Sequence, residues 1–299
     1  MFRKTKKGQA NKTPYLLLLP AFIVVFAIAA YTFWYLFRMS LVDWTFGAPW
    51  ESAEKVGFEN FIWLLINSTS PLWDSLKITV IYTLGSLLAE LFIGFSLALL
   101  LNEKIFGSSI YTSLLIIPIV IMPSMVGMIW RLYFSFDGLV NYFLESLIGI
   151  KVNWFSRQWA LLAAMIVDIW EWTPFFILIF LAGLRSLPVE PFESARVDGA
   201  SNWQILIYLT LPIMTPLILV GSILRFMDLL RIFDVIFVMF GGGPGNATTT
   251  LPILVWRETM MAQNTGRGSA VSIMLIILIV SFTTILYKLY QKSRQEGKE

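Results

Sequence analysis

Six stretches of this sequence are long and apolar enough to cross a lipid bilayer as single helices. A crossing helix needs about 20 predominantly apolar residues, because the hydrocarbon layer is roughly 30 Å thick. The composition agrees, since 57% of the 299 residues are hydrophobic and only 14% are charged. A soluble domain carries about 25% charged residues. We therefore expect an all-α fold, a polytopic transmembrane bundle of six spans. The expected spans are Pro14–Phe37, Ile78–Leu101, Ile110–Trp130, Trp159–Ala182, Ile205–Leu224 and Ala270–Tyr287.

A seventh apolar stretch, Ile232–Phe240, is too short to span and is expected to be interfacial or re-entrant. It leads into a glycine-rich turn that begins at Gly241. Continuous helices are expected for all six spans, because backbone polar groups cannot be left open to lipid. The third and fifth spans contain prolines near which the chain could bend, because proline removes helix hydrogen bonds and favours kinks that serve either gating or packing. These are Pro118 and Pro123 in the third span and Pro212 and Pro216 in the fifth.

Lysine and arginine gather at the two ends of the chain. Basic residues are retained on the cytoplasmic side of a membrane. Both termini are therefore expected in the cytoplasm, as basic tails at 1–13 and 291–299 around a membrane domain at 14–290. A basic start before an apolar run is also the pattern of a secretory signal. The run continues to Arg38, which is too long for a signal core and favours an anchored helix. The basic residues are Arg3, Lys4, Lys6, Lys7, Lys12, Lys288, Lys292, Arg294 and Lys298.

The chain contains no cysteine and no histidine. Disulfides, zinc sites of the Cys/His type, cysteine nucleophiles and histidine acid–base catalysis are therefore excluded, and no cofactor or metal is expected. The net charge of +3 is small and predicts no nucleic-acid partner; the environment is the lipid bilayer. A phosphate-binding loop needs G-x-x-x-x-G-K-[ST]. The nearest string, Gly8–Thr13, has Asn11 where the second glycine belongs, so any ATP must be hydrolysed on another chain.

The hydrophilic connection at residues 185–204, between the fourth and fifth spans, has the chemistry of two short helices that meet at a glycine. Glu193 suits the positive end of the first helix. Gly199 is placed to adopt the left-handed conformation that stops a helix. Ser201 and Gln204 have the spacing of a capping box that starts the second. By itself this is a well-capped connector. It offers two candidate apolar contacts, Phe192 and Trp203.

The same connection contains a spaced pattern. It reads Glu193-Ser194-Ala195, three residues, Gly199, nine residues, and then Leu209-x-Leu211-Pro212. This string resembles the EAA loop of the permease subunits of binding-protein-dependent ABC importers. Ser194 and Leu209 depart from that pattern, and both substitutions keep size and polarity close.

Short strings along most of the chain, roughly residues 14–290, also resemble carbohydrate-importer permeases. They are similar to the maltose-type and glycerophosphate-type subunits, specifically the first permease of the pair. In chain order these strings are Gly138-Leu139-Val140-Asn141, Trp154-Phe155, Ala182-Gly183-Leu184, Asp198-Gly199-Ala200-Ser201, Phe233-Asp234, Gly242-Gly243-Pro244 and Gly268-Ser269-Ala270.

The resemblance implies a six-helix permease in the cell (inner) membrane of a prokaryote. It implies four kinds of contact: a second homologous permease that completes the pathway, two copies of a cytosolic ABC ATPase, an extracytoplasmic solute-binding protein, and lipid. The 185–204 loop would transmit movement from the ATPase, and the solute would be a sugar or related polyol. The residues that would form the ATPase-coupling site are Phe192, Glu193, Ala195, Asp198, Gly199, Ala200 and Trp203.

Charged side chains inside a span are costly and usually face a bundle interior or an aqueous cavity. Asp168, Glu171 and Trp172 share one face of the fourth span. Two carboxylates beside an aromatic plane suit a sugar, because they accept hydrogen bonds from hydroxyls while the ring packs on C–H groups. Pairing with neighbouring helices explains them equally simply. For Glu90, alone in the second span, interhelical hydrogen bonding is the favoured role.

Several features are expected at the outer face. Arg225, Asp228, Arg231 and Asp234 follow the fifth span at three-residue spacing, which predicts surface salt bridges or, for the arginines, contact with an anionic solute. The first outer connection, residues 38–77, is acidic and aromatic, as suits an interfacial belt or a docking surface. The candidate outer-loop residues for the binding protein are Asp234, Gly242, Gly243 and Pro244.

Two readings from other functional classes stay open at this point. Asp168 with Glu171, or Asp228 with Asp234, could hold Mg²⁺ in a membrane-embedded enzyme, because magnesium prefers carboxylate oxygens. The chain could also work alone as a secondary transporter, which broken, charged helices in matching halves would support. The only hint of such halves is the echo between Leu115-x-x-Pro118 and Leu209-x-x-Pro212.

Overall fold

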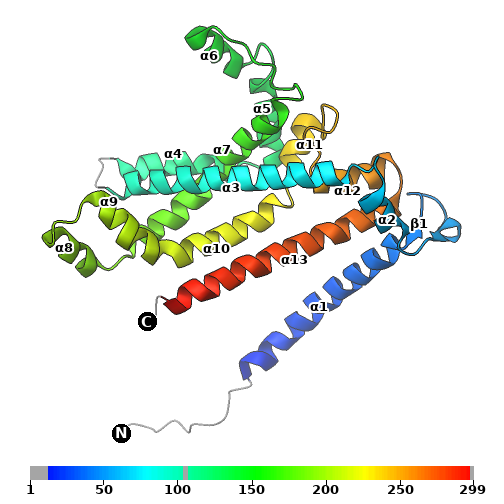
Figure 1. Ribbon diagram of the computed structural model, residues 1–299, viewed down its shortest axis with the longest axis horizontal. Helices are drawn as coiled ribbons and strands as arrows, with labels where there is room; N and C mark the ends of the chain where they lie inside the picture. The colour runs from blue at the N-terminus through cyan, green and yellow to red at the C-terminus, as the bar shows by residue number, and fades with distance from the viewer. Residues whose placement is uncertain (1–12, 104–106, 297–299) are drawn as a thin grey trace.

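The computed structural model describes residues 13–103 and 107–296, almost all of them in helices joined by short connections (Figure 1). Residues 1–12 and 297–299, which include nearly all of the first expected basic tail and the end of the second, lie outside the described residues. The long helices are α1 (Thr13–Ser40), α3 (Leu72–Asn102), α7 (Ala160–Arg185), α10 (Leu211–Leu229) and α13 (Thr265–Glu296). The shorter ones are α2 (Glu59–Ile66), α4 (Ser108–Val120), α5 (Pro123–Tyr133), α6 (Leu139–Ile148), α8 (Val189–Val197), α9 (Asn202–Ile205), α11 (Asp234–Phe240) and α12 (Leu251–Trp256).

Five continuous helical runs are long and apolar enough to cross a membrane, and they correspond to five of the six predicted spans. The predicted third span is different. It is broken at Ile121–Met122 into α4 and α5, whose axes differ by 98°. Met122 is extended because it precedes Pro123, and proline disfavours the helical conformation in the residue before it. The expectation of a continuous third helix is therefore wrong, while the count of about six spans holds if the bent pair is one span.

The centre of the bundle is the pair α3 and α7, which lie side by side along their length (Figure 1). A Cβ on Gly94 would lie only 2.5 Å from the Cβ of Phe176, so glycine permits this close approach. Phe180 on α7 packs edge-on against Phe95 on α3, with ring centroids 5.4 Å apart. α4 packs on α7, and α10 packs on both helices of the pair. Burial of these apolar side chains defines the core from which the other helices project.

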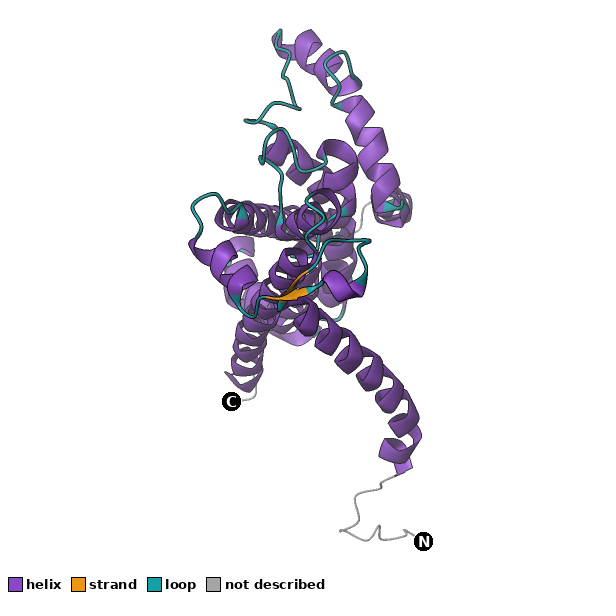
Figure 2. Cartoon of the chain, turned by 90° about the vertical axis from the view of Figure 1, so that its right-hand side faces the viewer, coloured by secondary structure: helices purple, strands orange, loops and turns teal. Residues whose placement is uncertain are grey.

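Helix α1 is almost uncovered in the isolated chain. None of its apolar window is buried, and it approaches α13 near β1 while diverging from it further along (Figure 1). α5 and α6 leave the bundle on the opposite side (Figure 2). α1 begins and α13 ends on the side of the molecule where α8 lies, and α2 and α12 lie at the other end. The predicted short segment forms α11, which has seven residues and packs on α5.

The connection at residues 38–77, expected from the sequence at the outer face, is folded. β1 (Val42–Asp43) pairs antiparallel with β2 (Glu54–Lys55), and a 3₁₀ turn, η1 (Trp50–Ser52), lies between them. The buried Asn60 amide donates hydrogen bonds to the backbone oxygens of Ser40 and Val42 at 3.0 and 2.9 Å. Asn264, at the start of α13, donates to Asp43 at 3.0 Å. This last bond attaches the connection to the start of α13.

Candidate functional site

The connection at 185–204 folds as its local chemistry predicts. α8 ends where the Gly199 N–H donates to the Arg196 oxygen at 3.1 Å and the Ala200 N–H donates to the Ala195 oxygen at 2.9 Å. This pair of bonds is a Schellman stop, and it needs a left-handed residue, which Gly199 supplies with φ of +81°. The stop turns the chain sharply between α8 and α9.

The second half of the connection starts with the predicted capping box. The Gln204 N–H donates to the Ser201 hydroxyl oxygen at 3.3 Å, and the Ser201 N–H donates to the Gln204 side chain at 2.8 Å. α9 continues without a gap through a π-helical turn, η2 (Leu206–Thr210), into α10. The connection and the span therefore form one helical run, Asn202–Leu229. We call α8, the Gly199 turn and α9 the coupling element.

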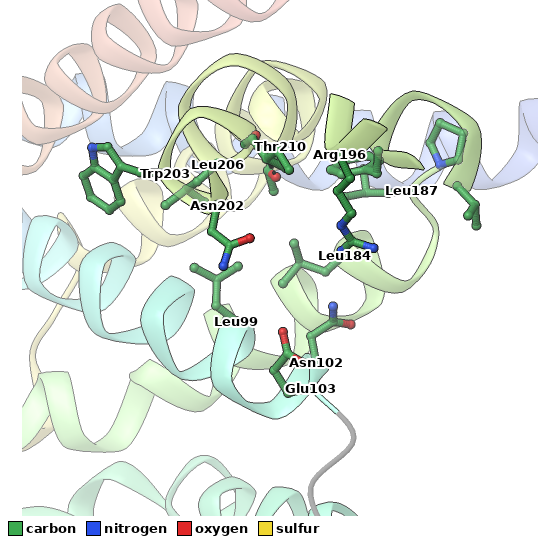
Figure 3. Close-up of a pocket in the computed structure, with 14 residues that line it drawn as sticks. Leu99, Asn102, Glu103, Leu184, Leu187, Arg196, Asn202, Trp203, Leu206 and Thr210 are labelled. Carbon is green, nitrogen blue, oxygen red and sulfur yellow. Dashed lines mark hydrogen bonds between the residues drawn. The ribbon is translucent and has the colours of Figure 1, made fainter. Parts of the chain in front are cut away.

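The coupling element covers a hollow of about 490 Å³ against the ends of α3 and α7 (Figure 3). Phe192, half-buried, lines it from α8, and Asn102 and Glu103 lie at its other rim. Trp203 borders the hollow yet is 70% exposed. Glu193 and Asp198 are exposed, while Ala195 and Ala200 are partly buried. An exposed indole and carboxylate on a short, stiffly capped element are groups with which another protein can pack and pair.

A network of buried charged side chains lies deeper in the bundle. Its members are far apart in the sequence, so the sequence pattern does not predict that they meet. Arg225 on α10 is 1% exposed, and its Nε and Nη2 donate to the two carboxylate oxygens of Glu90 on α3, both at 2.8 Å. Nη2 also donates to Asp168 on α7 at 2.7 Å, and Nη1 donates to Asp228 at 2.9 Å. The guanidinium lies over the Trp172 ring, 4.5 Å from its centroid. We call these groups the Arg225 network.

The network corrects one expectation and confirms another. Arg225 does not lie beyond the fifth span at the outer face, because α10 continues to Leu229 and buries it. Its donors are occupied by carboxylates, so it is not open to an anionic solute. Glu90 makes the predicted interhelical hydrogen bonds. Arg231 is exposed and lies 3.8 Å from Asp228, which is a surface pair of the predicted kind.

The predicted solute residues lie together on α7 with different exposures. Asp168 and Glu171 are buried, at 0% and 1% exposure, and Trp172 is half-buried. Asp168 is paired through Oδ2 only, because its Oδ1 has no hydrogen-bond partner among the described residues. Oε2 of Glu171 also has no hydrogen-bond partner among them. Of the three side chains, Trp172 offers the largest accessible surface in this structure.

The glycine-rich turn is ordered around Arg257, which lies in a second π-helical turn, η3 (Arg257–Met261). Arg257 donates to the Asn246 side chain at 2.7 Å and to the Gly245 oxygen at 3.3 Å. A Cβ on Gly242 would lie 2.7 Å from Ile253, so this position has no room for a side chain. The neighbouring candidates, Gly243, Pro244 and the exposed Asp234 at the start of α11, lie on the same side of the bundle as α12, away from the coupling element.

The fold and the site define a helical membrane protein of five or six spans that presents a capped two-helix element at one end. The chain belongs to the family described as binding-protein-dependent transport system inner membrane component, whose match extends over residues 10–295. It is thus a multi-pass inner membrane protein and the permease subunit of an ABC importer. ATP hydrolysis in such importers is carried by partner subunits, and neither a metal-dependent enzyme nor a stand-alone transporter is favoured.

Named proteins that are similar in sequence or fold support this family assignment. The chain is 36% identical over 292 residues to the trehalose/maltose transport system permease protein MalF of Thermococcus litoralis, covering 96% of this chain and 94% of that protein. It is 34% identical over 281 residues to the sulfoquinovosyl glycerol transport system permease protein SmoG of Agrobacterium fabrum, covering 92% and 89%. In fold it is similar to a chain of a bacterial ABC transporter that imports the acidic polysaccharide alginate, with a TM-score of 0.78, 23% identity and coverage of 94% and 95%.

Proposed function

We propose that this chain is the first permease subunit of a carbohydrate ABC importer and encloses half of a pathway for a sugar or related polyol. The observation that carries the proposal is the coupling element, which places Trp203 in solvent on the helical run that becomes a span. The names of the relatives from T. litoralis and A. fabrum support a carbohydrate as the solute. A second permease completes the pathway, because the apolar window of the long helix α1 is left uncovered by this chain alone.

The coupling element receives movement from two copies of a cytosolic ABC ATPase. Phe192 and Trp203 pack against the ATPase, and Glu193 pairs with a basic group there. Asp198, Gly199 and the small residues Ala195 and Ala200 shape the turn that holds these side chains in place. ATP-driven closure of the ATPase pair then moves α8 and, through α9, the span α10. The pathway opens outward to receive solute and inward to release it.

The opposite end of the bundle receives the extracytoplasmic solute-binding protein, with Asp234 and the turn Gly242-Gly243-Pro244 among its contacts. The permease domain covers residues 14–290, flanked by basic tails at 1–13 and 291–299 on the cytoplasmic side. The start of α1 and the end of α13 lie on the side of the molecule where α8 lies (Figure 1), which supports this orientation. Along the pathway, Trp172 supplies an aromatic plane to the solute. Asp168 and Glu171 lie behind it and are reached only after a movement.

The proposal is tested by purifying the full importer and measuring ATP-dependent sugar uptake in proteoliposomes. Gly199→Pro abolishes uptake and its coupling to ATP hydrolysis, because proline cannot adopt the positive φ of this turn. Glu193→Lys has the same effect through a reversed charge on an exposed site. Both variants insert into the membrane normally. Glu51→Lys, an equal charge change on exposed η1, is the matched control and keeps wild-type uptake.

Two results would overturn the proposal. One is wild-type uptake by Gly199→Pro or Glu193→Lys. The other is uptake by this chain alone, without an ATPase and a second permease in the purified complex. Binding of labelled trehalose, maltose and glycerol 3-phosphate to the cognate binding protein then separates a sugar from a phosphorylated polyol.

A further inference from the structure

Next to the Arg225 network on α7 lies one more buried carboxylate, that of Glu171, to which no hydrogen bond from Arg225 is formed. Glu171, one turn further along α7 than Asp168, is 1% exposed, and its Oε2 has no hydrogen-bond partner among the described residues. Burying a charged oxygen without a partner is unfavourable by several kcal/mol, so native structures avoid it unless the group has another use. Glu171 therefore calls for a physical explanation that static packing does not provide.

Arg225 contacts the two side chains that flank Glu171 on this part of α7, namely Asp168 and Trp172. Its guanidinium already lies over the ring of Trp172, the residue next to Glu171 in sequence. Asp168 and Glu171 are three residues apart, which is about 4.5 Å along a helix axis. Shifts of packed helices by up to one turn, about 5.4 Å, are an established form of conformational change. Arg225 can therefore exchange the Asp168 carboxylate for that of Glu171 with a displacement of this size.

Arg225 is also the polar connection between α10 and the bundle centre. Among the described residues, the side-chain hydrogen bonds that join α10 to α3 or α7 all come from Arg225. The other contacts are apolar, such as Gly221 against Phe176, and such surfaces can slide without breaking a directional bond. The position of α10 along α7 is thus set by which carboxylate Arg225 holds.

The same helix begins in the coupling element. Asn202 and Arg225 belong to one helical run, 23 residues apart and so about 35 Å along its axis. The π-helical turn η2 lies directly after α9, and such turns occur as local irregularities at functional sites. A push on the coupling element is therefore delivered to the Arg225 network through α10.

We infer that Glu171 is the alternative acceptor of Arg225, and that Asp168 and Glu171 define two positions of α10 during transport. In this structure Arg225 holds Asp168, and in the second conformation it holds Glu171 while keeping a hydrogen bond to Glu90. Allosteric coupling requires such a two-state element, biased from both ends. Glu171 is then a positioning residue that acts through Arg225. This inference rests on the proposed importer function and adds to it the internal step between ATPase and pathway.

The test uses the complete importer in proteoliposomes. The chain contains no cysteine, so Leu100→Cys on α3 and Tyr208→Cys in η2, both exposed, are the sites for spin labels on this chain, in an importer whose other subunits have had their cysteines replaced. The distance between the two spin labels is measured without nucleotide and with ATP plus vanadate. In the labelled wild type, the two conditions should give two different distance populations, one for each position of α10. Glu171→Gln should keep only the nucleotide-free population and reduce sugar uptake by about tenfold or more. Asp168→Asn should favour the second population even without nucleotide.

Thermal unfolding provides an independent readout. Glu171→Gln breaks no ion pair of this structure and should not lower the midpoint, while Asp168→Asn weakens an existing ion pair and should lower it. Glu258→Gln, a buried carboxylate outside the network, is the control and should keep both populations and wild-type uptake. Two populations and full uptake in Glu171→Gln overturn this inference. Loss of ATP-driven uptake in the wild-type complex would instead overturn the proposed function, so the two failures are distinguishable.

Discussion

Arg225 on α10 and Glu90 on α3 form a two-pronged ion pair, with both N···O distances at 2.8 Å and both side chains almost fully buried. The partners are 135 residues apart in sequence. Fork-shaped pairing of this kind fixes orientation as well as distance. It joins two spans at one depth of the bundle, and Asp168 attaches a third span to the same cation.

The two ends of this pair differ in what their removal leaves behind. Arg225→Leu leaves Glu90 and Asp168 buried without a cation, whereas Glu90→Leu leaves Arg225 paired with Asp168 and Asp228. Removing one partner of a buried pair costs about 3–5 kcal/mol, because the remaining charge is uncompensated. We expect Arg225→Leu to lower the thermal midpoint of the detergent-solubilised protein clearly more than Glu90→Leu does. Equal midpoints, or the opposite order, would contradict the geometry of the network.

Substitution of Trp203 is expected to weaken binding of the ATPase without destabilising the fold of this chain. Its side chain is 70% exposed, so truncation removes little buried apolar surface from this chain. We expect Trp203→Ala to unfold at the wild-type temperature but to lose at least about tenfold in affinity for the ATPase subunit, as truncation of an interface tryptophan often does. Pull-down of purified ATPase with the permease pair measures this. Trp73→Ala, an exposed tryptophan at the other end of the bundle, serves as the comparison and should retain the ATPase.

The coupling element was predictable from sequence because its signals are local. The Schellman stop at Gly199 and the capping box at Ser201 and Gln204 need only residues within a few positions of one another. The spans were predictable for a similar reason, since hydropathy is read in a window of about 20 residues. Pro123 was visible as a kink signal, but the size of the break depends on how α5 packs against α11.

The Arg225 network was not predictable, because its partners come from three helices. From sequence, Arg225 falls just outside an apolar window and beside Asp228 and Arg231, so a surface ladder of charges is the simplest interpretation. The true end of α10 at Leu229, and the two carboxylates that face Arg225 from α3 and α7, are set by packing. The intramembrane carboxylates Glu90 and Asp168 gave the usable signal, since such a group needs a partner elsewhere, but nothing local in the sequence names that partner.

Gly266 in α13 fits closely against the first outer connection. A Cβ there would collide with the backbone oxygen of Val42 and lie 2.8 Å from the Asn60 side chain. Backbone cannot yield to such an overlap cheaply, so Gly266→Ala should release the connection from α13 and speed its cleavage by protease. Gly221→Ala is the matched helical control, because its added Cβ would meet Phe176 at an ordinary 3.4 Å. If both variants resist protease as the wild type does, the packing at Gly266 is looser than described.

Asn141 organises the arm that carries α6. Its amide donates to the backbone oxygens of Phe136 and Val152 at 3.0 and 2.8 Å, and its Oδ1 accepts from the Val152 N–H and the Trp154 indole, each at 3.1 Å. Asn141→Leu leaves these buried groups without partners, at about 1–3 kcal/mol for each one that water cannot reach. We expect hydrogen exchange to accelerate at residues 136–154 and to stay unchanged in α3 and α7. Asn153→Leu, at an exposed neighbouring position, should leave exchange in the arm unaltered; acceleration there as well would assign the effect to added apolar surface and not to the lost hydrogen bonds.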